Sequence, residues 1–170
     1  MKKLAIAACA VVLGAGVTFA SSLSVPWFVD NAPVANKVPG VASGVTGLVT
    51  LKNTTGAPIT AQITYFAQDG TNLGPNGADA TFSIAADSSL AFRPVANDPD
   101  SVGGGQEGPQ GLAVPNRPTP DGKKNGALVV QWPGDPTDIQ GQVAYFQTTI
   151  DPSRGGYVTL TYAHLLPPGI

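Results

Sequence analysis

Short alternating runs separated by turn residues are the feature that most constrains the fold of this chain. The runs are rich in Val, Ile, Thr and aromatic residues and lie between clusters of Gly, Pro, Asn and Asp. This pattern is typical of antiparallel strands, and no stretch has the longer period of an amphipathic helix. The runs predict about eight strands, at 23–29, 45–52, 58–68, 79–85, 88–95, 127–132, 138–149 and 156–165.

The links between these runs favour an all-β fold, a single antiparallel β-sandwich. "NTTGAP" (Asn53 to Pro58) separates two strong runs, and Asp69-Gly70 supplies a turn in which Gly tolerates a positive φ. "AADSS" joins the runs at 79–85 and 88–95. Strands with such short links form either a small barrel or two packed sheets, and we expect the sandwich.

One link, a loop at 96–126, is far longer than the others and rich in Gly and Pro. A structureless link of this length is either functional or mobile. Phosphate binding is not expected, because no helix follows the Gly cluster. Calcium ligation by Asp98, Asp100 and Glu107 is an alternative, although their spacing fits no standard calcium loop. We interpret the loop as a flexible excursion and expect no cofactor or metal.

Residues 1–20 have the layout of a cleavable signal peptide. Lys2 and Lys3 precede the apolar run "LAIAACAVVLGAGV", and "TFA" places small residues before a cleavage point after Ala20. A membrane anchor is less suitable, because the run is shorter than the roughly 20 residues that span a bilayer. Lipid attachment at Cys9 is a further alternative. The sequence therefore predicts export to the periplasm, the cell surface or the medium, with one sandwich domain at 21–170.

Removal of the predicted signal peptide changes the net charge and the cysteine content of the chain. Removing Lys2 and Lys3 from nine basic residues leaves seven against eleven acidic ones, a net charge of −4. No basic patch is visible, so we expect no nucleic-acid partner. Because no second apolar span follows, we also expect no stable membrane insertion after cleavage. The only cysteine, Cys9, is lost with the signal, so no disulfide is expected.

The residues available for catalysis are few. His164 is the only histidine, so multi-His zinc sites and Cys–His chemistry are excluded from the processed chain. We interpret His164 as a structural residue on the apolar face of its strand. A carboxylate pair for glycoside hydrolysis stays open, because its separation in space is not readable from sequence. Asp135 and Asp138 look like turn formers instead. We expect no enzyme.

The phase of the alternation divides the aromatic residues into two groups. On a strand, neighbouring side chains point to opposite faces. Tyr65 and Tyr145 follow the aliphatic stripes of their strands and are predicted in the core, as are Phe82 and Phe92. Trp27 and Trp132 are also predicted to point inward. Three rings fall on otherwise polar faces and form the candidate interface: Phe28, Phe66 and Phe146.

Two explanations suit three large rings on polar faces. The long loop or a chain terminus could cover them, or a β-bulge could shift the phase. Alternatively, the rings are anchors for a protein partner or for a second copy of the chain.

"LVTLKNTTGAPITAQITYFAQDG" (Leu48 to Gly70), followed by "FSIAADSSLAF" (Phe82 to Phe92), resembles bacterial exported immunoglobulin-like or fibronectin-like sandwich domains. The resemblance implies a scaffold and no particular activity. The strand layout also resembles the sensory rhodopsin transducer family, which would imply an oligomeric sandwich; the signal peptide departs from that cytoplasmic family. The Cys…Trp…Cys arrangement of immunoglobulin domains is absent.

The sequence therefore predicts an exported, non-enzymatic structural or interaction module that binds a protein partner or assembles with itself through exposed aromatics. The alternative is a carbohydrate-binding sandwich that stacks a glycan on Trp27, on Trp132 or on the out-of-phase Phe rings.

Overall fold

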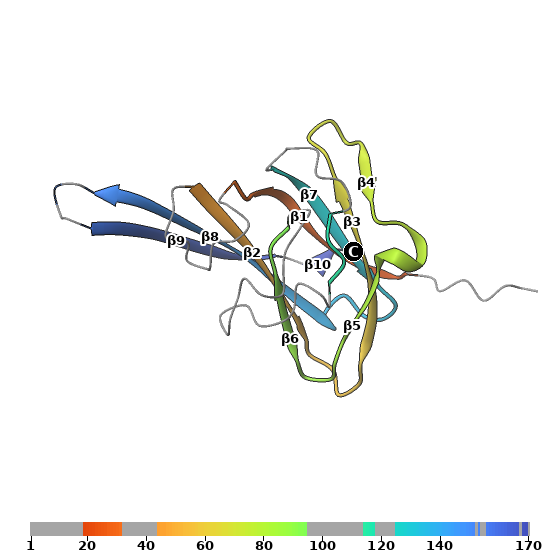
Figure 1. Ribbon diagram of the computed structural model, residues 1–170. Helices are drawn as coiled ribbons and strands as arrows, with labels where there is room; N and C mark the ends of the chain where they lie inside the picture. The colour runs from red at the N-terminus through yellow and green to blue at the C-terminus, as the bar shows by residue number, and fades with distance from the viewer. Residues whose placement is uncertain are drawn as a thin grey trace, which may run out of the picture.

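The computed structural model describes residues 19–31, 44–94, 114–117, 125–151, 153, 156–166 and 168–169, and it confirms an all-β sandwich of two antiparallel sheets. Figure 1 shows the two sheets packed over one another. Most of the predicted signal peptide and most of the loop at 96–126, with Asp98, Asp100 and Glu107, lie outside the described residues. In the described part of the chain, no helix is long and apolar enough to cross a bilayer.

The first sheet has the order β10-β1-β7-β3-β4, with β5 pairing to β3 beside β4. Its long central strands are β3 and β7, which pair from Gln62↔Gln131 to Phe66↔Ala127. The sheet contains β1 (Ser21–Val29), β3 (Ile59–Phe66), β4 (Asn72–Gly74), β5 (Thr81–Ile84), β7 (Asn125–Trp132) and β10 (Pro168–Gly169).

The second sheet has the order β6-β2-β8-β9. It contains β2 (Gly44–Asn53), β6 (Ser89–Phe92), β8 (Ile139–Asp151) and β9 (Gly156–Leu166). β8 and β9 form a long hairpin that extends beyond the body of the sandwich (Figure 1). After Leu166 the chain crosses to the first sheet, where β10 pairs with β1.

All eight predicted strands are present, with shifted ends. The prediction at 79–85 is too long, because a 3-10 turn, η1 (Gly77–Ala80), precedes β5. β4 and β10 were not predicted, since two or three residues carry no readable alternation. The predicted turns are confirmed: Gly70 has φ 84°, and the Asp138 carboxylate accepts a 2.8 Å hydrogen bond from the Asp135 backbone N–H.

The core lies between the sheets and follows the predicted phase in most strands. Tyr65 is fully buried, and its hydroxyl donates to the Pro115 carbonyl at 3.1 Å. Tyr145 is also buried, and its hydroxyl donates to the Trp27 carbonyl at 2.7 Å. The first bond holds Pro115 of the long loop against β3. The second connects β8 of the second sheet to β1 of the first. Further buried core residues include Leu23, Val49, Leu51, Ile63, Phe82, Phe92, Leu128, Trp132 and Val143.

β1 departs from the predicted phase. Val25 pairs with Leu128 and Phe28 pairs with Gly126, so β1 carries one more residue than β7 across this interval, a β-bulge. The predictions for Trp27 and Phe28 are therefore wrong: the Trp27 side chain is 42% exposed and Phe28 is 1% exposed. A β-bulge, one of the two explanations offered for rings on polar faces, accounts for both side chains.

Two buried polar groups join the sheets. Asn53, at the end of β2, donates through Nδ2 to the carbonyls of Ala57, Ile84 and Ala85, at 2.8, 3.2 and 3.0 Å. Asp30, just after β1, forms a fully buried ion pair with Arg93, just after β6. Arg93 Nε donates to Asp30 Oδ2 at 2.9 Å. Neither contact was predicted.

Candidate interaction surface

The three predicted interface rings do not share one surface. Phe28 lies in the core, with its ring edge-on to Tyr65 at a centroid distance of 6.5 Å, and so cannot meet a partner. Phe66 and Phe146 are half-buried. Phe66 lies on the outer face of the first sheet and Phe146 on the outer face of the second, because the residues on either side of each ring point into the core.

Phe28 is buried because β7 carries a glycine opposite it. A Cβ at Gly126 would lie 3.2 Å from Phe28 Cζ and 2.6 Å from the Phe66 carbonyl oxygen. Only a residue without a side chain leaves this space to the ring. The bulge and Gly126 thus act together: the first turns Phe28 inward and the second makes room for it.

Large exposed hydrophobic side chains in the described residues are Trp27 and Leu165, which are 42% and 78% exposed. Trp27 lies on β1 and Leu165 on β9, two strands that contact each other across the sheets. β1 borders the first sheet except for the two-residue β10, and β9 is the last strand of the second sheet. We call this border, formed by β1 and β9, the open side; the chain crosses between the sheets here, from β9 to β10.

A hydrogen bond to the second sheet fixes the backbone of the open side at Trp27. The Trp27 carbonyl accepts the Tyr145 hydroxyl, so its backbone is held against the second sheet while its ring is partly exposed. The side chain of Leu165 belongs to the outward face of β9, since the next residue, Leu166, is buried. An apolar ring and an aliphatic side chain at a sheet border are suited to contact with another surface.

The alternation pattern did not predict either residue as exposed. Alternation predicts Trp27 in the core, because a bulge is visible only against the partner strand. Leu165 could have been found, because the predicted apolar stripe of its strand, which includes His164, leaves Leu165 on the opposite face. The side chain of His164 itself lies outside the described residues, so its predicted structural role stays a prediction.

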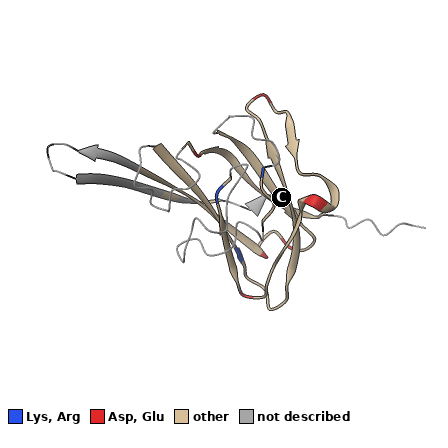
Figure 2. Cartoon of the chain, viewed as in Figure 1, with Lys and Arg blue, Asp and Glu red and all other residues tan. Residues whose placement is uncertain are grey.

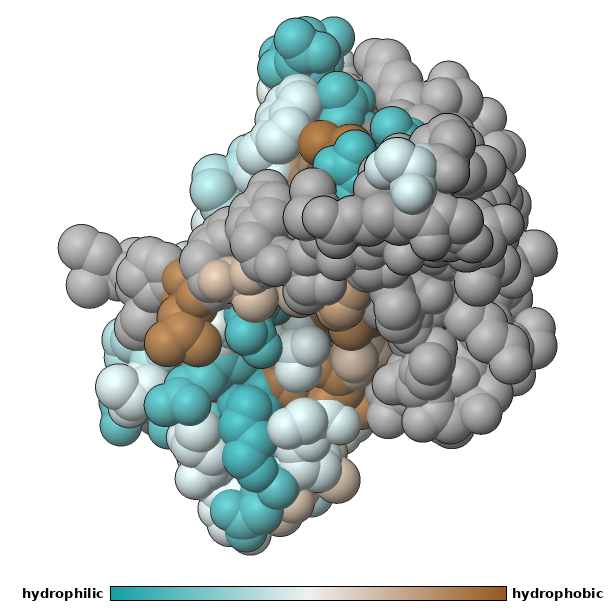
Figure 3. Space-filling view, turned by 90° about the vertical axis from the view of Figure 1, so that its left-hand side faces the viewer, coloured by the Kyte–Doolittle hydropathy of each residue, from teal (hydrophilic) through white to brown (hydrophobic). Residues whose placement is uncertain are grey.

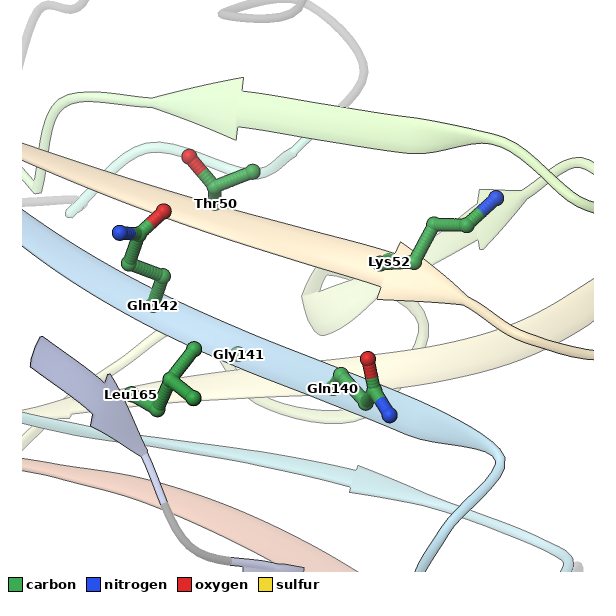
Figure 4. Close-up of a pocket in the computed structure, with 6 residues that line it drawn as sticks. All are labelled: Thr50, Lys52, Gln140, Gly141, Gln142 and Leu165. Atoms are coloured by element: carbon green, nitrogen blue, oxygen red, sulfur yellow. The ribbon is translucent and has the colours of Figure 1, made fainter.

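A shallow hollow of about 130 Å³ lies on the outer face of the second sheet. Figure 4 shows side chains from β2 and β8 around it, with Gln142 pointing toward Thr50. The Lys52 ammonium donates to the Asp87 carbonyl and so is already engaged. The volume is well below the 300 Å³ or more that is typical of an enclosed ligand pocket. The hollow is lined by Thr50, Lys52, Gln140, Gly141, Gln142 and Leu165.

Charged groups lie mainly in turns and at strand ends (Figure 2). In the part of the chain that the structure describes, no three His, Cys, Asp or Glu residues gather as a metal site. The buried Asp30–Arg93 pair lies between the sheets, with both side chains at 0% exposure, and therefore serves packing rather than an external ligand.

The fold is an antiparallel β-sandwich of two sheets, with Trp27 and Leu165 exposed. No protein-family model matches the chain, and no curated protein matches it. Among solved structures, the crystal structure of Thermotoga maritima 1070 is similar to it, with a TM-score of 0.46 and 12% sequence identity over 85% of this chain and 92% of that one. No family assignment follows from a likeness of this size.

Proposed function

We propose that the protein is an exported, non-enzymatic structural or interaction module whose open side contacts another protein. The residues at 1–20 support export, and the resemblance to exported immunoglobulin-like or fibronectin-like domains supports a scaffold role. The observation that carries the proposal is that the exposed Trp27 and Leu165 lie on two adjoining border strands.

Exposure of these side chains has a physical cost in a chain without a partner. Burial of a side chain of this size is worth roughly 1.5–3 kcal/mol. Isolated exposed apolar residues need no explanation, whereas these two lie on border strands that contact each other. Aromatic residues such as Trp27 are also the residues that dominate binding energy at protein interfaces.

Site-specific photo-crosslinking in the producing cells tests this role without knowledge of the partner. A photo-crosslinking amino acid is placed at position 27 or 165, and at Ser83 as the control, an exposed residue of β5. We expect protein adducts from positions 27 and 165 and none from position 83. Equal yields from all three positions, or adducts from position 83 alone, would contradict the open side as the contact surface.

A carbohydrate-binding function is the second candidate, and the exposure of Trp27 favours it. A half-exposed indole on a rigid strand can stack on a sugar ring. A glycan array probed with the processed protein tests this alternative. Binding that is lost in Trp27→Ala but kept in Phe66→Ala would support it, and the absence of any bound glycan would exclude the sugars on the array.

A further inference from the structure

Three of the four sheet borders carry features that discourage pairing with another strand. β6 has four residues and β4 has three. The β1 border carries Pro26 and a bulge, and β10 adds only two residues to it. Short strands, Pro and bulges are the usual means by which edges avoid unwanted pairing.

β9 is different. It has eleven residues, "GYVTLTYAHLL", and in the described part of the chain it pairs with β8 only. The strand contains no Pro and no Lys, Arg, Asp or Glu, and most of its residues have high strand propensity. A long edge of this composition offers a row of backbone donors and acceptors to another strand.

The charge pattern favours one occupant of this edge. The 21–170 segment has a net charge of −4, so a contact between two copies has to form where opposed like charges are absent. β9 carries no formal charge apart from the titratable His164, so two β9 strands can lie side by side without opposed like charges. A two-fold contact also needs a surface that complements itself, and two identical antiparallel edges satisfy this condition.

Building on the proposed function, we propose that the partner is a second copy of this chain and that the two copies join through their β9 strands. The pairing is antiparallel and two-fold symmetric, and it merges the second sheets of both copies into one continuous sheet. Backbone hydrogen bonds supply the affinity, and Leu165, beside the new seam, is covered by the other copy. Figure 3 shows apolar residues exposed on one face of the molecule, beside hydrophilic ones.

Light scattering on the purified, processed protein tests the pairing. We expect a mass twice that of the chain at micromolar concentration. Leu165→Lys places a charge beside the edge and should weaken the dimer at least about tenfold. Ser83→Lys, which adds the same charge on β5, should leave the dimer unchanged. A monomer at all concentrations would overturn the proposal.

A cysteine scan locates the contact. The processed chain contains no cysteine, so single cysteines are placed along β9, at Thr159, Thr161, Ala163 and Leu165, with Ser83→Cys as the control. In a two-fold antiparallel pair, one position lies near its own symmetry mate. Disulfide-linked dimers should therefore peak at one or two β9 positions and be absent from Ser83→Cys.

Different results would overturn the β9 pairing and the proposed function as an interaction module. A dimer that crosslinks equally at all positions, or only outside β9, overturns the β9 pairing and leaves an interaction module. Photo-adducts from position 165 that contain a different protein also overturn the second-copy assignment but support the module. A β9 peak together with a monomeric Leu165→Lys supports both.

Discussion

Phe28 shows how one extra residue in a strand decides whether a side chain is buried or exposed. Its ring is buried against Tyr65 because a bulge in β1 turns it inward and Gly126 leaves it space. The neighbouring Trp27 is exposed for the same reason. A ring that alternation alone would assign to the surface is therefore part of the core.

Replacement of Phe28 should reveal this. Phe28→Ala should lower the free energy of unfolding by about 3–5 kcal/mol, the usual cost of removing a buried ring. Phe66→Ala is the matched control; its ring is half-buried, so the loss should be less than half as large. Urea denaturation measures both. Similar losses for the two variants would show that Phe28 is not in the core.

The buried ion pair is a second residue-scale feature. Arg93→Ala leaves the Asp30 carboxylate between the sheets without its main partner and should cost about 3–5 kcal/mol. The double variant Asp30→Leu/Arg93→Met replaces both charges by apolar groups and should recover most of that loss. Urea denaturation of the unchanged protein and of both variants measures how much of the loss is recovered. If the double variant is less stable than Arg93→Ala, the pair acts through more than its charges.

At the scale of elements, the turns carry the connections between the sheets. Asn53 closes the β2–β3 turn and also reaches the β5–β6 turn, because its Nδ2 donates to carbonyls from both segments. Its Oδ1 accepts from the Thr55 backbone N–H at 2.8 Å. One side chain therefore holds the end of β2 against the first sheet.

Removal of this amide should loosen both turns together. Asn53→Ala should cost about 1–3 kcal/mol, because buried backbone carbonyls lose their donor. Amide hydrogen exchange should become faster in the β2–β3 and β5–β6 turns and stay unchanged in the hairpin of β8 and β9. Faster exchange confined to the β2–β3 turn would mean that Asn53 does not link the two.

Strand positions were largely predictable, since alternation and turn chemistry are local. Tyr65, Tyr145 and Trp132 were predicted inward and are buried. The bulge could not be predicted, because the extra residue is visible only against the partner strand β7. The Asp30–Arg93 pair joins residues far apart in the chain, so no local pattern reports it. The alternation of its strand is enough to predict Leu165 on the face opposite the apolar stripe. Its place at a sheet border was not predictable, because that depends on the position of β9 in the sheet.

At the scale of the whole molecule, the sandwich has one side unlike the others. Its remaining borders are short, bulged or interrupted by Pro, whereas β9 is long and carries no Lys, Arg, Asp or Glu. Trp27 and Leu165 lie on this side. A sandwich with one long, uncharged edge is suited to the proposed assembly, and pairing through β9 would leave the outer face of the first sheet accessible.

Concentration-dependent amide hydrogen exchange tests this central claim most directly. The processed protein is compared at low and high concentration, and exchange is measured in each strand. We expect the β9 amides to become protected as the concentration rises, while those of β4, β5 and β6 do not change. Exchange in β9 that is the same at every concentration would contradict the account.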